Sequence, residues 1–181
     1  MSAQEIDDAI LKPGSVVKWL RVTIMAAIMS AIAFVGFVAP ASANGATQIA
    51  GVGFFAETGE CTDSEGSGSD FALRMTGDLQ GCLYVFVETF ECSPSGTYRE
   101  TGTEIYVGGG SEGDDGTFST TYRFTAKLEV CPDLATEIFG RCQHPIVAGS
   151  GTGDFEGVTG RLDIKDDLAA GNFPYRGHLR W

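Results

Sequence analysis

TFSTTYRFTAKLEV, residues Thr117 to Val130, alternates apolar and polar side chains along its whole length. Successive side chains of a β-strand point to opposite faces, so this period of two predicts a strand with one apolar and one wet face. The wet face begins at Thr117 and carries Arg123, Lys127 and Glu129. The predicted apolar face consists of Phe118, Thr120, Tyr122, Phe124, Ala126, Leu128 and Val130.

The end of the chain repeats this alternation from Asn172 to Trp181. Shorter stretches of the same kind lie between segments rich in Gly, Ser, Asp and Pro, such as residues 63–69, 93–96, 108–116 and 166–171, which are typical of turns. The other predicted strands are Gln48–Glu57, Asp70–Gly77, Gly81–Phe90, Thr97–Val107, Ile146–Gly149 and Val158–Lys165.

Eight short strands without helices between them predict an all-β domain, either a closed barrel or a sandwich. We favour an eight-stranded antiparallel closed barrel with a meander topology. Successive hairpins close without leaving an exposed edge, and no long crossover segment is left over for a Greek key. The side chains predicted to face inward are Phe118, Tyr122, Phe124, Leu128, Phe173, Tyr175, Leu179 and Trp181.

The N-terminus has the three parts of a bacterial-type signal peptide. Residues 1–21 contain three basic side chains, residues 22–38 are uncharged and almost wholly apolar, and the sequence APASA ends at Ala43. We expect cleavage after Ala43, which leaves residues 44–181 as a single barrel domain in the periplasm or outside the cell. The alternative is an uncleaved N-terminal anchor.

The exported part is strongly acidic and keeps the net charge of −12 that the whole chain carries. Such a surface repels phosphate backbones and anionic headgroups, so we expect neither a nucleic-acid partner nor stable membrane insertion after cleavage. Residues 109–116, GGSEGDDG, have the oxygen ligands of a calcium loop but no EF-hand spacing, and a solvated hairpin loop is the favoured interpretation. No metal or cofactor is predicted.

Residues 149–160, GSGTGDFEGVTG, invite comparison with a phosphate-binding loop. A dinucleotide fingerprint needs its third glycine elsewhere and a helix after it, whereas a strand is predicted to follow here. The glycines therefore indicate close turns before a strand.

The same stretch, continued by GNFPYRGHLRW, resembles the C-terminal hairpin of allene-oxide-cyclase-like and dirigent-like barrels. The matching residues are Gly151, Gly153, Phe155, Gly157, Gly160, Tyr175 and Gly177. The resemblance implies an eight-stranded barrel with an apolar cavity, often oligomeric, and in some members cyclisation or orientation of a small hydrophobic substrate. It carries no catalytic residue over to this chain.

One carboxylate, Glu88, shares a predicted face with Cys82, Tyr84, Phe86 and Phe90. Pairing through the SPSG turn would bring Arg99 diagonally opposite Glu88, within reach of long side chains.

This predicted Glu88–Arg99 pair either orients a ligand in a cavity or forms an ion pair on the outer wall, and the second interpretation is favoured. The candidate cavity residues are Tyr84, Phe86, Glu88, Arg99, Tyr122, Phe124 and Tyr175. Of the two histidines, His144 is expected in a loop before Pro145 and His178 on a wet face.

The expected positions of the five cysteines follow from the direction of each strand. Alternating strands would place Cys61, Cys92, Cys131 and Cys142 at one end of the barrel and Cys82 at the other. We therefore predict the disulfides Cys131–Cys142 and Cys61–Cys92, with Cys82 as the free thiol. The alternative Cys61–Cys82 disulfide would need a crossover that a meander lacks.

Three functions remain open on this sequence. The first is a barrel that binds a small apolar molecule, the second is a cofactor-free cyclase or isomerase of the same fold, and the third is a structural or interaction module with a filled interior.

N-terminal sequencing of the secreted protein tests the leader. We expect the mature chain to begin at Asn44, because Ala41 and Ala43 occupy the small-residue positions before the cut. Released soluble protein that still carries residues 1–43 would contradict this prediction.

Overall fold

The computed structural model describes residues 45–110 and 115–181 of the chain. The predicted leader lies outside these residues, as does the middle of the acidic loop 109–116. Within them the chain forms strands β1 to β9 and two short 3₁₀ turns. The strands are β1 (Thr47–Phe55), β2 (Phe71–Gly77), β3 (Leu79–Cys92), β4 (Thr97–Gly110), β5 (Asp115–Leu128), β6 (Glu137–Pro145), β7 (Thr152–Gly153), β8 (Thr159–Lys165) and β9 (Phe173–Arg180); the turns are η1 (Ser64–Gly66) and η2 (Leu134–Thr136).

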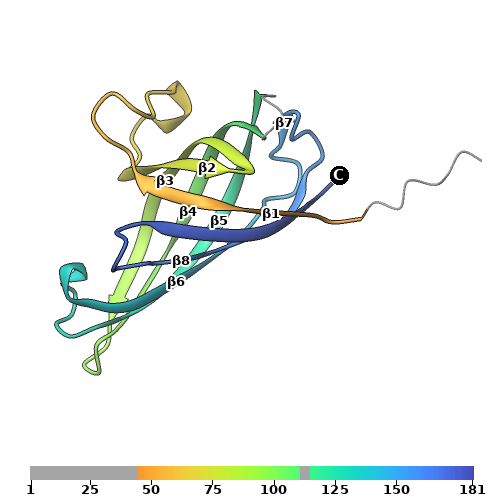
Figure 1. The fold of residues 1–181 in the computed structure, drawn as a ribbon. Helices are drawn as coiled ribbons and strands as arrows, with labels where there is room; N and C mark the ends of the chain where they lie inside the picture. The colour runs from red at the N-terminus through yellow and green to blue at the C-terminus, as the bar shows by residue number, and fades with distance from the viewer. Residues whose placement is uncertain (1–44, 111–114) are drawn as a thin grey trace, which may run out of the picture. The chain divides into compact units, whose positions relative to one another are not determined.

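The sheet closes on itself as an eight-stranded antiparallel barrel (Figure 1). Each long strand pairs with the next along the chain, and β9 returns to pair with β1, where Tyr175 lies opposite Gly51. The two-residue strand β7 pairs with the start of β5 beside this ring of eight. The prediction of a closed meander barrel is confirmed.

One predicted strand was wrong: residues Ile146–Gly149 do not form a strand, and β6 occupies Glu137–Pro145 instead. The inward positions of β6 carry Gly140, Cys142 and His144, which are small or polar. The usual apolar alternation is therefore absent, and the sequence pattern gave no sign of this strand. His144 consequently points into the barrel and does not lie in a loop.

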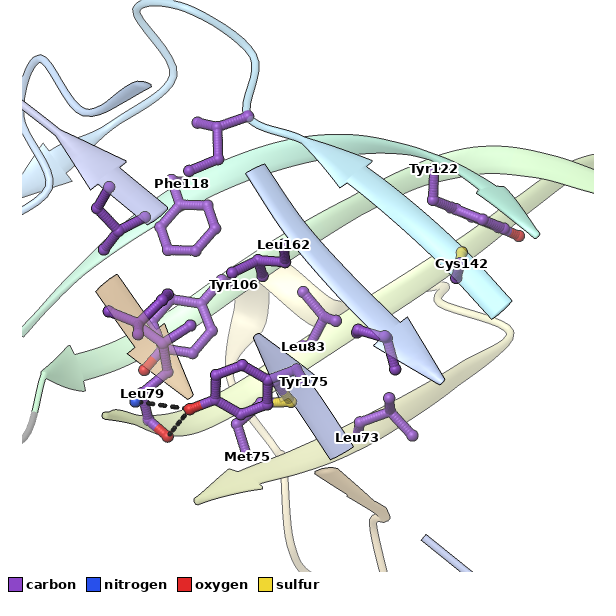
Figure 2. Packing of buried hydrophobic residues seen from close by; sticks show 14 of the residues in the cluster. Leu73, Met75, Leu79, Leu83, Tyr106, Phe118, Tyr122, Cys142, Leu162 and Tyr175 are labelled. Atoms are coloured by element: carbon purple, nitrogen blue, oxygen red, sulfur yellow. Dashed lines mark hydrogen bonds between the residues drawn. The ribbon is translucent and has the colours of Figure 1, made fainter. Parts of the chain in front are cut away.

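The interior is packed with aromatic and branched side chains (Figure 2). The alternation predicted for residues 117–130 is confirmed as far as Leu128, because Phe118, Tyr122 and Leu128 of β5 are buried and Phe124 is half-buried. Val130 lies beyond the end of β5 and is 59% exposed. Tyr175 and Leu179 are buried and Phe173 packs on the same cluster. Trp181 was predicted inward but is 51% exposed, with its indole Nε1 donating to the Asp154 carbonyl on the surface.

One end of the barrel is plugged by the glycine-rich turn between β7 and β8. Phe155 is only 3% exposed and packs against the rings of Tyr106 and Phe118 at centroid distances of 5.6 and 5.1 Å. Val158, three residues further along the chain, is completely buried as well. The glycine-rich stretch 149–160 therefore closes this end of the apolar core.

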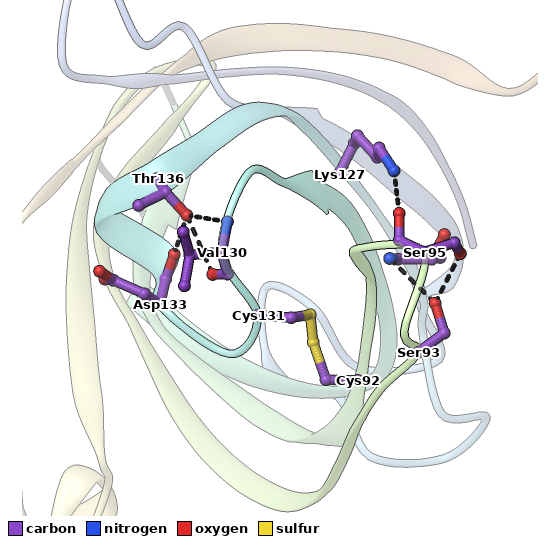
Figure 3. The surroundings of a disulfide bond; sticks show 9 residues. Cys92, Ser93, Ser95, Lys127, Val130, Cys131, Asp133 and Thr136 are labelled. Carbon is purple, nitrogen blue, oxygen red and sulfur yellow. Dashed lines mark hydrogen bonds between the residues drawn. A yellow bond between two sulfur atoms is a disulfide. The ribbon is translucent and has the colours of Figure 1, made fainter.

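Both predicted disulfides are wrong: the structure pairs Cys61 with Cys82 and Cys92 with Cys131, at Cα separations of 5.5 and 6.0 Å. Cys142 is the buried free cysteine, because it lies within β6 and points inward. It therefore cannot reach Cys131, which sits at the rim beyond the end of β5 (Figure 3).

The wrong disulfide prediction for Cys61 has a separate cause. The segment 56–70 does not stay at the rim after β1 but folds back along the outer wall of β2 and β3. There Asp63 bonds to the Tyr84 hydroxyl and Glu60 forms an ion pair with Arg74 at 3.1 Å. This loop brings Cys61 to Cys82 without any crossover of strands.

Peptide mapping under non-reducing conditions should recover Cys61–Cys82 and Cys92–Cys131. Alkylation of Cys142 should require unfolding, because its side chain is buried in the barrel wall. Recovery of a disulfide that contains Cys142, or its rapid labelling in the native protein, would contradict the observed orientation of β6.

Candidate functional site

The end of the barrel opposite the plug is uneven, because the strands differ in length. Strands β3, β4 and β5 have 14 residues each, whereas β1, β2, β8 and β9 have nine, seven, seven and eight. The long strands therefore extend beyond the short ones, and part of their inner face has no strand opposite it. Phe90 on this face of β3 is 61% exposed although its register partner is the inward-facing Glu100.

Aromatic side chains gather at this end, which we call the mouth. Phe90 stacks on Tyr98 at 5.9 Å between ring centroids, and Tyr98 meets Phe124 edge to face at 6.1 Å. On the short strands, Phe55 contacts both Phe71 and Phe173 edge to face. Phe55 is 60% exposed despite these contacts.

The Cys92–Cys131 disulfide lies over one side of this end (Figure 3). It packs with Tyr98, Ala126 and Leu128 into a small cluster separate from the main core. The disulfide thus ties the ends of β3 and β5 together and buries Tyr98, while Phe90 beside it stays exposed.

Glu100 lies on the inner face of β4 at the mouth. On the neighbouring strands its register partners are Phe90 and Phe124. Its carboxylate accepts hydrogen bonds from the hydroxyls of Tyr98, at 2.6 Å, and Tyr122, at 2.7 Å. Burial, together with the hydrogen bond to Glu100, raises the pKa of both tyrosines, so they remain protonated donors.

Deeper in the barrel, Glu104 of β4 meets His144 of β6. The His144 Nδ1 lies 2.6 Å from the Glu104 Oε2, which also accepts from the Thr120 hydroxyl, and both the histidine and the glutamate side chains are at least 96% buried. The pair reaches across β5, where Tyr122 stacks near the imidazole at 6.2 Å between ring centroids. The other imidazole nitrogen, Nε2, is buried and has no hydrogen-bond partner.

Two further carboxyls, Glu137 and Asp166, converge over Gly140 beside the Phe124 ring. A side chain at position 140 would collide with both carboxyls, so the glycine makes room for them. Burial, followed by the effect of Asp166, raises the pKa of Glu137 to about 8, and burial also raises the pKa of Asp166. One proton is therefore retained between the two carboxyls at neutral pH.

The buried thiol of Cys142 lies opposite Phe124 in the register of β5 and β6. Burial raises its pKa, and the nearby carboxylate of Glu104 adds to this effect. The thiol is consequently protonated and has little nucleophilic character.

Three of the predicted cavity residues face inward, and two lie on the outer wall. Tyr122 and Phe124 face the mouth, and Tyr175 faces the interior, where its hydroxyl accepts from the Leu79 amide at 2.8 Å and donates to the Thr76 carbonyl. Tyr84 and Phe86 lie on the outer wall. Burial raises the pKa of Tyr84 to about 12 under the segment 56–70.

The predicted Glu88–Arg99 contact is wrong. A register shift between Val87 and Thr89 leaves Glu88 exposed and turns Phe90 inward. Arg99 points outward and forms an ion pair with Glu91 at 3.1 Å.

Sequence reasoning missed Glu100, Glu104 and His144. Two glutamates on the inner face of β4 mask its apolar alternation. On β6 the alternation is masked by inward residues that are small or polar. One signal was present, because Thr120 is the single polar residue among apolar ones on its face of β5 and lies directly opposite Glu104. A polar position on an otherwise apolar face indicates a buried polar partner.

No protein-family model, curated protein or solved structure matches the chain. Among residues 45–110 and 115–181, no group of three or more His, Cys, Asp or Glu side chains is placed to hold a metal ion. In the same residues, no helix is long and apolar enough to cross a membrane.

The paired carboxyls give a pH-dependent stability. Because Glu137 has an ordinary pKa of 4.5 and a folded value of about 8, the folded protein holds a proton that the unfolded chain has released. The free energy of unfolding should therefore fall as the pH rises from about 4.5 to about 8. Urea denaturation across this range should show a shallower decline in Glu137→Gln, whose side chain is neutral throughout.

Glu91→Gln is the matched control, because Glu91 is exposed on the outer wall. It should keep the pH dependence of the wild-type protein. Equal slopes for the wild type and Glu137→Gln would contradict the shared proton.

Proposed function

We propose that this protein is an exported ligand-binding barrel that takes up a small, largely apolar molecule through the mouth. The observation that carries the proposal is the contrast between the two ends of the interior. Phe155 and Val158 are buried and plug one end, whereas inward-facing aromatic side chains at the other end are exposed to solvent.

The composition of the mouth fits small-molecule recognition. Binding sites of this kind are lined mainly by apolar and aromatic side chains, with a few polar groups that fix orientation. Here Phe55, Phe90 and Phe124 provide apolar surface, and the carboxylate of Glu100 lies between them as the polar group.

Export is part of the same proposal. It is supported by the signal-peptide pattern of residues 1–43 and by the two disulfides, which are typical of oxidising compartments. The resemblance of the C-terminal hairpin to allene-oxide-cyclase-like and dirigent-like barrels supports a small hydrophobic ligand.

A cofactor-free isomerase or cyclase is the second candidate, and the Glu104–His144 pair favours it. In the neutral imidazole whose Nδ1–H donates a hydrogen bond to the carboxylate, Nε2 keeps a lone pair that can accept a proton from a bound molecule. The third candidate, a filled structural module, describes the plugged half of the barrel but leaves the exposed mouth aromatics unexplained.

A neutral dye tests binding at the mouth. Nile red should bind the purified protein and fluoresce more strongly as it leaves water. Val87→Trp should weaken this binding at least tenfold, because Val87 is a half-buried inward position of β3 and a larger side chain would occupy the space beside Glu100.

Thr89→Trp adds the same indole to the outer face of the same strand, where Thr89 is exposed, and should bind Nile red as the wild type does. Wild-type affinity in Val87→Trp, with both variants folded, would place the dye elsewhere and contradict the proposal.

A further inference from the structure

The basic side chains are confined to the outer side of the barrel wall. All nine Lys and Arg side chains of residues 44–181 lie within the described residues, and each occupies an outward position of its strand. Four carboxyls, by contrast, lie on the inner side: Glu100, Glu137 and Asp166 near the mouth, and Glu104 deeper in the barrel. The interior described here thus holds acidic groups without a Lys or Arg to balance them.

Glu100 is the carboxylate that a ligand can reach. It is half-buried, and its two hydroxyl partners, Tyr98 and Tyr122, donate hydrogen bonds but carry no positive charge. Each carboxylate oxygen keeps a further lone pair. The rings of Phe90 and Phe124 flank it in the register, and aromatic faces attract cations.

The Nε2 of His144 is a buried polar atom of the interior that has no hydrogen-bond partner. Its side chain is 96% buried, and the contact of Nδ1 with Glu104 accounts for only one of its two nitrogens. In the neutral imidazole with Nδ1 donating, Nε2 is an acceptor. Both the reachable carboxylate and the buried nitrogen therefore offer acceptors, and the partner that fits them is a donor.

We propose that the ligand is an organic amine bound as its ammonium ion, which donates to Glu100 while its apolar part lies against Phe90 and Phe124. This inference rests on the proposed function and names the ligand class for the same mouth. An ammonium ion supplies several donors and the positive charge that the interior lacks. A neutral alcohol supplies one donor and no charge, and a carboxylate is repelled.

Three probes of similar size separate these chemistries: 2-phenylethylamine, 2-phenylethanol and 3-phenylpropanoate. Isothermal titration calorimetry at pH 7 and constant ionic strength should show the amine binding at least tenfold more tightly than the alcohol. The carboxylate should bind most weakly of the three.

Glu100→Gln keeps the shape of the side chain and removes its charge. It should lose at least tenfold in affinity for the amine and keep the affinity for the alcohol, which also reports that the mouth is still folded. Glu91→Gln, which removes a carboxylate from the outer wall of the same hairpin, should bind all three probes as the wild type does.

Phe90→Leu provides a second variant that does not disturb the core, since Phe90 is largely exposed. It keeps an apolar side chain but removes the aromatic face. Its affinity for the amine should fall about threefold more than its affinity for the alcohol.

The outcomes separate this inference from the function on which it rests. If the amine binds no more tightly than the alcohol, or binds Glu100→Gln as well as the wild type, the amine inference is overturned. Nile red binding that Val87→Trp weakens would still support the ligand-binding barrel in that case. If neither Nile red nor any of the three probes binds, both fail.

Discussion

The barrel depends on the contact between Tyr175 and Gly51 at the seam where the last strand meets the first. The two residues are register partners, and a Cβ atom on Gly51 would overlap the tyrosine ring and the Thr76 carbonyl. The hydroxyl of Tyr175 also bonds to the turn between β2 and β3 through Leu79 and Thr76. The Tyr175 side chain therefore connects the seam between β1 and β9 to the hairpin of β2 and β3. Any residue with a Cβ atom at position 51 would prevent this contact.

The same constraint shapes the rest of the interior. An eight-stranded barrel is just wide enough for side chains to fill, so a large ring on one strand needs a small residue on its neighbour. Gly102 opposite Tyr122 repeats the arrangement at the mouth, and Gly177 opposite Leu162 repeats it beside the seam. In the plugged half, Phe118 and Tyr106 are fully buried, whereas inward-facing rings at the mouth, such as Phe90, are exposed.

Because the strands differ in length, the two ends of the barrel differ: one is plugged, and the other has exposed inward-facing aromatic side chains. Because β3, β4 and β5 extend beyond their neighbours, the inner residues near their ends are reachable from solvent, and Glu100 is among them. Charged groups inside a protein are costly unless they are bonded. The hydroxyls of Tyr98 and Tyr122 meet this need for Glu100, and the Thr120 hydroxyl and the His144 imidazole meet it for Glu104.

The sequence by itself determined the class of the fold, the antiparallel meander and the inward face of β5, because a period of two forces alternate side chains to opposite sides of a sheet. It failed wherever that period is broken or masked. A bulge after Val87 reversed the face of Phe90, and small or polar inward residues concealed β6 and with it His144 and Cys142.

Only the tertiary structure decided the disulfides and the site. The path of segment 56–70 along the outer wall, which brings Cys61 to Cys82, has no periodic signature in the chain. The contact between Glu104 and His144 joins residues 40 positions apart across an intervening strand. Such contacts follow from the register and closure of the whole barrel, and local patterns of side chains do not encode either one.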